Sequence, residues 1–302
     1  MTIHTASDPR PEWLPENEYP FDLRTIGVDG HTVTYIDEGS GPILLFVHTG
    51  MWSFIFRDVI VRLRKEFRCI TLDFPGYGLS PEPADSDLGL ADQAGLLAGF
   101  VDALGIGDIT LVLHDLGGTV GAGFAADHPD RIRGMVMANT FAWKPEGVAL
   151  LRMLRIVSSR PLTAIDKVTR FIPRVTTTKS GVGLNLSKEG KLAFMGPFAS
   201  RRTVERFHAL MRDALTEDAL YQRIEAATVA SPLRDKPVLT IFGEKNDPFG
   251  FQERHHATFP NHRGLVVANG NHFPMLDDPD LFAERLETWW HEEVEASSAE
   301  EM

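Results

Sequence analysis

The 302-residue sequence predicts an α/β fold in which a mostly parallel, eight-stranded sheet is flanked by helices and interrupted by an all-helical insertion. Two observations predict this fold. Short, continuous apolar runs, typical of strands buried on both faces of a parallel sheet, alternate with segments of helical period along most of the chain. Between about Trp143 and Ser231 this alternation stops, and only helical patterns remain.

The expected sheet begins with an antiparallel hairpin. Leu23–Val28 and Thr32–Glu38 alternate apolar and polar residues on either side of Asp29-Gly30, a dipeptide that favours a tight turn. The later strands are expected at the continuous apolar runs, which are Ile43–Val47, Cys69–Leu72, Ile109–Leu113, Met135–Ala138, Val238–Phe242 and Leu265–Val267.

Helical patterns separate these strands. They lie at Phe54–Phe67, Leu90–Leu104, Thr119–Asp127 and a last helix that opens at Asp277. Before the first strand, the first twenty residues are polar and rich in proline, so we expect them to form an extended arm on the surface.

The insertion is predicted to form a cap over the carboxyl edge of the sheet, where open α/β sheets bind their ligands. The chain then divides into a first core part at residues 1–142, the cap at 143–231 and a second core part at 232–302. The helices expected in the cap are Glu146–Val157, Thr163–Phe171, Lys188–Phe194, Arg201–Leu215 and Glu217–Val229.

Composition is that of an ordinary globular protein, with 43% hydrophobic and 24% charged residues. The net charge of −12 repels phosphate backbones and anionic lipid, so we expect neither a nucleic acid nor a membrane as partner. The single cysteine, Cys69, lies in an apolar run and cannot form an internal disulfide. With no signal sequence visible at the N-terminus, we expect a cytoplasmic monomer or homodimer.

The strongest chemical signal is the segment from Leu111 to Gly118, in which an apolar strand runs into Asp115 and then into two glycines that open a helix. This pattern is typical of a nucleophile elbow, a sharp strand-to-helix turn that tolerates only small neighbours. The alternative is that Asp115 caps the helix after a buried strand. We interpret Asp115 as the nucleophile because its partners are also in place.

The candidate base is His272, which follows the last predicted strand and precedes the last helix, where the elbow enzymes keep their histidine. The other loop and helix histidines of this region are expected on the surface, and they show no metal-ligand spacing with cysteine or acidic partners. They are His255, His256, His262 and His291. No metal is therefore expected.

The candidate acid is Asp247, in the loop after the strand Val238–Phe242. A carboxylate there can accept a hydrogen bond from the imidazole and stabilise its charged form. Glu244 is the rival in the same loop. Asp247 is preferred because an Asp-Pro pair closes such a loop, and the order nucleophile, acid, base is the one that this fold requires.

The loop after Ile43–Val47 supplies the candidate oxyanion hole, formed by backbone N–H groups of Thr49, Gly50 and Leu116. Trp52, at the end of this loop, is either a pocket residue or a core residue at a helix start.

Together these residues resemble the haloalkane dehalogenase family of α/β-hydrolases and its epoxide hydrolase and haloacetate dehalogenase relatives. The elbow with aspartate is specific to this group. The matching segments span nearly the whole chain outside the cap and are Val47-His48, Trp52–Arg57, Asp73–Ser80, His114–Gly118, His128–Arg131, Asn139–Trp143 and Asn271–Phe273.

Several positions depart from the pattern of the family. A tryptophan that holds the departing halide usually follows the nucleophile, whereas this chain has Leu116. The loop after His48 is one residue shorter and lacks a halide-binding asparagine. In one branch of the family the acid follows the strand before the cap, where this chain has Asn139. Epoxide hydrolases need two cap tyrosines, and this cap has only Tyr221.

The resemblance implies hydrolysis through a covalent ester of Asp115, with no cofactor. The partners implied are a small apolar substrate and a halide ion. His48, Trp52 and Trp143 are the candidate residues of the substrate and halide pocket. The first expectation is a haloalkane dehalogenase. The alternatives are an epoxide or ester hydrolase, or a ligand-binding protein with a degenerate halide site.

Overall fold

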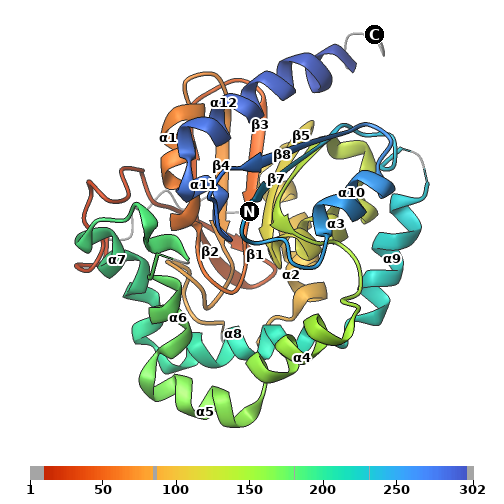
Figure 1. The fold of residues 1–302 in the computed structure, drawn as a ribbon. Helices are drawn as coiled ribbons and strands as arrows, with labels where there is room; N and C mark the ends of the chain where they lie inside the picture. Colours follow the sequence, from red (N-terminus) through yellow and green to blue (C-terminus); the bar gives the residue numbers. More distant parts are fainter. Residues whose placement is uncertain (1–9, 84–86, 180, 231, 298–302) are drawn as a thin grey trace.

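The computed structural model describes residues 10–83, 87–179, 181–230 and 232–297, and Figure 1 shows their arrangement. Its sheet has eight strands in the order β1-β2-β4-β3-β5-β6-β7-β8, in which β2 pairs antiparallel with both β1 and β4 and the other pairs are parallel, which confirms the predicted fold. The strands are β1 (Arg24–Val28), β2 (His31–Glu38), β3 (Ile43–Val47), β4 (Arg68–Asp73), β5 (Ile109–Asp115), β6 (Ile132–Thr140), β7 (Val238–Gly243) and β8 (His262–Val267).

Helices cover the sheet in two groups, because the central strands are apolar on both faces and need cover on each. The first group packs α1 against α12, and the second packs α2 against α3. Gly105 ends α2 in the left-handed region, with φ of 63°, as the sequence predicts. The helices and turns of the core are η1 (Ser53–Phe56), α1 (Arg57–Leu63), α2 (Leu90–Leu104), α3 (Gly117–Asp127), η2 (Pro129–Arg131), α10 (Phe251–Thr258), α11 (Pro274–Asp277), α12 (Pro279–Trp289) and η5 (Trp290–Glu295).

Between β6 and β7 the described residues form helices and no strand, and we call this segment the insertion. Its elements are α4 (Val148–Val157), α5 (Arg160–Thr169), α6 (Phe171–Thr176), η3 (Val182–Leu184), α7 (Lys188–Met195), η4 (Gly196–Ala199), α8 (Arg201–Asp213) and α9 (Asp218–Thr228). The short helix α6 was not predicted separately. Both α4 and α5 pack on α8, whereas α9 packs against α3 of the core.

The inner helix of the insertion, α8, lies over the loop that follows β3. Gly50 in this loop has φ of 81°, and a Cβ there would lie 3.3 Å from the ring of Phe207 and 3.6 Å from Leu210. The insertion therefore meets the carboxyl edge of the sheet, where the loops after β3 and β5 lie.

The segment before β1 differs from the extended surface arm that its prolines predict. Leu14 and Tyr19 are each only 1% exposed. The Tyr19 hydroxyl is hydrogen-bonded to Ser53 at 2.7 Å, and the Trp13 ring meets Trp52 edge-on at 5.6 Å. The aromatic side chains between the prolines are large enough to join the core, which the polar composition of the segment concealed. Residues 1–9 of the predicted arm lie outside the described residues.

No helix in the described part of the chain combines the length and the apolarity needed to cross a membrane.

Candidate active site

Asp115 lies at the end of β5 in a strained turn. Its φ is 52°, a left-handed conformation that non-glycine residues rarely adopt and that occurs at functional turns. The turn leaves no room for side chains beside it. A Cβ on Gly117 would lie 2.3 Å from the Val47 carbonyl oxygen, and one on Gly118 would lie 1.8 Å from the Thr140 hydroxyl. This geometry is that of the nucleophile elbow expected from the two glycines.

His272, in the loop between β8 and α11, lies beside Asp115. Its Nε2 is 3.0 Å from Asp115 Oδ2, although the two residues are 157 positions apart in the chain. Their side chains keep 29% and 26% of their exposure, so both remain reachable. The structure thus brings together the two residues that the sequence predicts as nucleophile and base.

The other side of His272 faces an amide instead of a carboxylate. Its Nδ1 lies 2.9 Å from Asn246 Oδ1. Asn139, at the end of β6, donates from Nδ2 to the Asn246 carbonyl at 2.7 Å and accepts from the Gly243 N–H at 2.8 Å. The residue that faces His272 Nδ1 and the residue at the end of β6 are therefore both asparagines, and the two are in contact.

The prediction that Asp247 accepts this hydrogen bond is not met in the structure. The Asp247 carboxylate caps α10, where it accepts from the N–H groups of Phe251 at 2.7 Å and Gln252 at 3.0 Å. The rival, Glu244, accepts from the Asn269 N–H at 2.7 Å and does not face the imidazole either. An Asp-Pro pair is as suited to a helix start as to a catalytic loop, so the motif alone does not separate the two roles.

Asn246 was not predicted from the sequence, because the usual partner of a catalytic imidazole is a carboxylate. The available signal was its position in the chain. Asn246 is the third residue after Gly243 and closes a turn in which the Asn246 N–H donates to the Gly243 carbonyl at 2.9 Å. Adjacent residues in such a turn point in different directions, so the neighbouring Asp247 turns toward α10.

The hydrogen bonds define the protonation of the pair. The Asn246 Oδ1 only accepts, so His272 Nδ1 carries a proton, and an Nε2 that faces a carboxylate must carry one too. The free site therefore holds an imidazolium beside an aspartate. Burial alone raises the pKa of the Asp115 carboxyl, but the hydrogen bond and charge of His272 hold that pKa well below its usual value.

Two further histidines lie beneath the elbow. His114 Nε2 is 2.7 Å from the His272 carbonyl oxygen, which can only accept, so this nitrogen carries the proton. Burial, followed by His272 and His48, lowers the pKa of His114, which leaves its Nδ1 unprotonated. That nitrogen accepts from His48 Nδ1 at 3.1 Å. The buried Nε2 of His48 is then an unprotonated nitrogen without a hydrogen-bond partner among the described residues.

The candidate halide pocket is not assembled as expected. Trp52 donates from its indole to the Phe194 carbonyl at 3.1 Å and is 1% exposed, so it is the core residue of the two alternatives. His48 has no proton on its free nitrogen, so in this tautomer it cannot donate to an anion.

Trp143 packs on α10. Its ring lies 4.7 Å from that of His255 and 4.4 Å from the guanidinium carbon of Arg254, the arrangement of a packing residue between insertion and core. His255 itself is fully buried and hydrogen-bonded to the Thr140 carbonyl at 3.0 Å, which corrects the expectation that it lies on the surface.

The oxyanion hole formed by the backbone N–H groups of Thr49, Gly50 and Leu116 remains a prediction. Leu116 is 1% exposed and is the N-cap residue of α3, so its N–H belongs to the elbow. The Thr49 hydroxyl donates to Gln93 Oε1 at 2.5 Å, which ties the loop after β3 to α2. The side chain of Thr49 is therefore engaged elsewhere, and only backbone N–H groups of this loop are left for an anion.

Comparison with known proteins gives three results. A family model described as alpha/beta hydrolase fold matches residues 42–279. Haloalkane dehalogenase 2 of Mycobacterium tuberculosis is 33% identical over 94% of this chain and 97% of its own length. A cis-3-alkyl-4-alkyloxetan-2-one decarboxylase of Shewanella oneidensis is 34% identical over 86% of each chain.

Among solved structures, haloalkane dehalogenase DbeA from Bradyrhizobium elkani superposes with a TM-score of 0.80. The alignment covers 92% of this chain and 99% of DbeA, at 23% identity. A likeness at this level of identity supports the fold.

Proposed function

Since the chain belongs to the α/β-hydrolase family, within its haloalkane dehalogenase branch, we propose that it hydrolyses the carbon–halogen bond of small, mostly apolar haloalkanes. The observation that carries this proposal is the pair Asp115 and His272, 3.0 Å apart at the elbow. A carboxylate with a depressed pKa is an ionised nucleophile across the physiological range, and a histidine beside it can serve the second step.

In the first step, an Asp115 oxygen attacks the carbon that bears the halogen. The carbon–halogen bond breaks, and the halide leaves with the bonding electrons, so an alkyl ester forms on Asp115. Esterification removes the negative charge that faces His272 Nε2. The imidazolium then loses the partner that stabilises it, and its Nε2 proton is released to solvent.

In the second step, the unprotonated Nε2 of His272 takes a proton from water, and the hydroxide adds to the ester carbon. Collapse of this adduct expels the alcohol oxygen, which takes the proton from His272. The resulting carboxylic acid returns its proton to His272 and restores the starting pair. The balance is one water consumed, with one alcohol, one halide and one proton released.

We assign Asn246 as a positioning residue for this base, held in turn by Asn139. A neutral amide fixes the tautomer of His272 without adding charge. No side chain described above offers a donor to the halide, so the leaving group depends on backbone N–H groups such as that of Leu116. We therefore expect bromides and iodides, which leave more easily, to react faster than chlorides.

The test of this function is to trap the ester. His272→Phe should permit the first step and block the second, so 1-bromobutane should add a butyl group to Asp115. Mass spectrometry of the intact protein and of its peptides would detect and locate the group. Asp115→Asn is the matched control and should remain unmodified. Bromide release by the wild type without any adduct in His272→Phe would contradict the scheme.

A second candidate is the opening and decarboxylation of an alkyl β-lactone, which the name of the 34%-identical Shewanella relative describes. Attack of Asp115 on the ring carbon that bears oxygen would free a carboxylate. Loss of carbon dioxide would then expel Asp115 and leave an alkene. This route needs no halide donor and no activated water, which suits a site with Leu116 and the neutral Asn246. Alkene formation from a dialkyl β-lactone, without bromide release from haloalkanes, would favour it.

Epoxide hydrolysis is less well supported, because the cap tyrosine is engaged. The Tyr221 hydroxyl donates to the Ala214 carbonyl at 3.1 Å in the junction between α8 and α9, and the residue is 3% exposed. An epoxide at Asp115 would need another proton donor for its oxygen.

A further inference from the structure

The insertion exposes an unusual number of apolar side chains. Of the twelve large hydrophobic residues that are exposed in the described part of the chain, nine lie between residues 148 and 192. We call the exposed surface of α4, α5 and α6 the outer face. In Figure 1 these helices lie along the lower edge of the molecule, away from the C-terminus. The apolar residues of the outer face are Val148, Met153, Ile156, Ile165, Val168, Phe171 and Val175.

Helix α5 exposes its apolar side and buries its polar side, so the packing of this helix requires apolar residues to be exposed. Its buried side carries polar residues, with Thr163 at 7% and Asp166 at 0% exposure. The buried Asp166 accepts from His208 Nε2 at 3.0 Å, which anchors α5 to α8 by its polar side. The opposite side then presents Ile165, 56% exposed, and Val168, 64% exposed, to the surroundings. Surface helices normally show the reverse arrangement.

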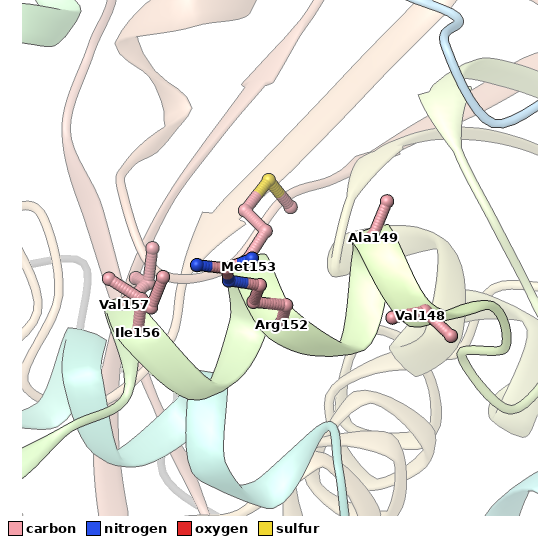
Figure 2. Close-up of a pocket in the computed structure, with 6 residues that line it drawn as sticks. All are labelled: Val148, Ala149, Arg152, Met153, Ile156 and Val157. Carbon is pink, nitrogen blue, oxygen red and sulfur yellow. The ribbon is translucent and has the colours of Figure 1, made fainter.

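Helix α4 adds a groove to the outer face. Figure 2 shows the side chains along it, which line an open hollow of about 570 Å³. Val148 is 85% exposed, and Met153 and Ile156 are 44% and 55% exposed. Apolar surface of this extent usually marks a place of interaction.

The segment that contains the outer face is also basic in an acidic protein. Residues 148–192 hold nine lysines and arginines against two acidic residues, whereas the whole chain holds 30 against 42. One of the two acids is the buried Asp166. Arg152, Arg155, Arg160 and Arg174 are exposed, and none forms an ion pair with another described residue. The net charge, from which no membrane partner is expected, hides this uneven distribution.

We propose that the outer face docks on an anionic membrane surface. Helices that combine exposed apolar side chains with arginines lie in the interface of a bilayer, where the apolar groups enter the headgroup boundary and the arginines meet lipid phosphates. The positive charge of the outer face favours an anionic membrane over a second copy of the chain as its partner. A symmetric dimer through the same patch would bring these arginines against their own counterparts. The proposal is independent of the reaction at Asp115.

Helix α8 lies between this surface and the loop above the site, since α4 and α5 pack on it and Gly50 lies close to Phe207. A protein docked in this way would hold its site next to the apolar phase.

The test is sedimentation of the full chain with vesicles of phosphatidylcholine alone or mixed equally with phosphatidylglycerol. The wild type should bind the anionic vesicles and bind them less as salt rises. Ile165→Asp with Val168→Asp, and separately Arg152→Glu with Arg155→Glu, should each weaken binding about tenfold or more. The matched controls are Val229→Asp, an apolar residue 68% exposed outside the face, and Arg285→Glu in α12, and both should bind as the wild type does.

Two results would overturn the proposal. The first is equal sedimentation with neutral and anionic vesicles, or none with either. The second is a dimer in analytical ultracentrifugation that the outer-face variants dissociate, because the face would then be covered by a second copy. Circular dichroism of each variant shows whether it remains folded, and the two independent pairs of substitutions keep the test valid if one pair does not fold.

Discussion

At the scale of single residues, the site consists of Asp115 and His272, and the imidazole is oriented by an amide where a carboxylate is usual. Asp115 and His272 form the ion pair that a covalent mechanism needs, but the third position holds the amide of Asn246. A carboxylate there would stabilise the imidazolium throughout the cycle, whereas the amide supplies only orientation. In the proposed reaction, Asp115 is the one carboxylate hydrogen-bonded to His272 among the described residues, and its esterification removes that negative charge.

This arrangement makes Asn246→Asp an informative substitution. A carboxylate opposite Nδ1 should stabilise the proton that His272 gains from water and speed hydrolysis of the ester by about tenfold or more. Single-turnover kinetics with 1-bromobutane, which separate bromide release from ester hydrolysis, measure this effect.

The matched control is Asp247→Asn. An asparagine keeps an oxygen that can accept from the first N–H groups of α10 and caps helices about as well as an aspartate, so Asp247→Asn should change the free energy of unfolding by less than about 1 kcal/mol and the rate of ester hydrolysis by less than about twofold. Loss of activity in Asp247→Asn, with no change in Asn246→Asp, would return the acid role to Asp247.

At the scale of elements, the elbow depends on how closely α3 approaches β3. Gly117 has no room for a Cβ because the Val47 carbonyl oxygen lies in its place. Backbone cannot move aside as a flexible side chain can, so the junction between β5 and α3 requires glycine. The strained φ of Asp115 is held by this packing and by the Thr140 hydroxyl, which donates to the Asp115 carbonyl.

We predict that Gly117→Ala lowers the free energy of unfolding by roughly 1–3 kcal/mol and removes most activity, because the helix must shift away from the strand. Gly95→Ala is the control. Gly95 lies within α2 with nothing within 4 Å of an added Cβ, so alanine should stabilise the protein by roughly 0.5–1 kcal/mol. Urea unfolding of both variants checks the prediction, and a Gly117→Ala protein of unchanged stability and rate would contradict it.

At the scale of the whole molecule, buried histidines couple stability to pH. Burial lowers the pKa of both His48 and His255 from 6.5 to about 4. A lowered pKa means that the stabilisation is complete above pH 6.5 and is lost as the pH falls toward 4, because the unfolded chain binds protons that the folded chain excludes. Asp73 acts in the opposite sense, since burial raises its pKa from 3.8 to about 6.

We therefore expect the free energy of unfolding to fall between pH 7 and pH 5, with contributions on the order of 1–2 kcal/mol each from His48 and His255 at pH 5. Urea titrations across this range should show a shallower dependence for His255→Gln, which no longer titrates.

His291 provides the opposite control. Hydrogen bonding to Glu295 raises its pKa, so it stabilises the folded chain at low pH and loses this effect as the pH rises. His291→Gln should therefore steepen the loss on acidification. Equal slopes in all three proteins would show that these histidines do not govern the pH dependence.

The sequence by itself determined the features that depend on short-range pattern. Apolar runs of strand length, helical periods and the Asp115-Gly117-Gly118 turn identify the sheet, its order along the chain and the elbow, because each is encoded within a few residues. The place of His272 after β8 could also be predicted, since the loops at the carboxyl ends of the parallel strands meet at one edge.

Only the tertiary structure decided which neighbour in a turn faces the site and which side of a helix faces outward. Asn246 rather than Asp247 meets His272, because the turn after β7 directs Asp247 to α10. Helix α5 buries Asp166 because His208, 42 residues away, supplies a partner inside the insertion. Such contacts join residues that are distant in the chain, and their free energy depends on three-dimensional neighbours that no local pattern records.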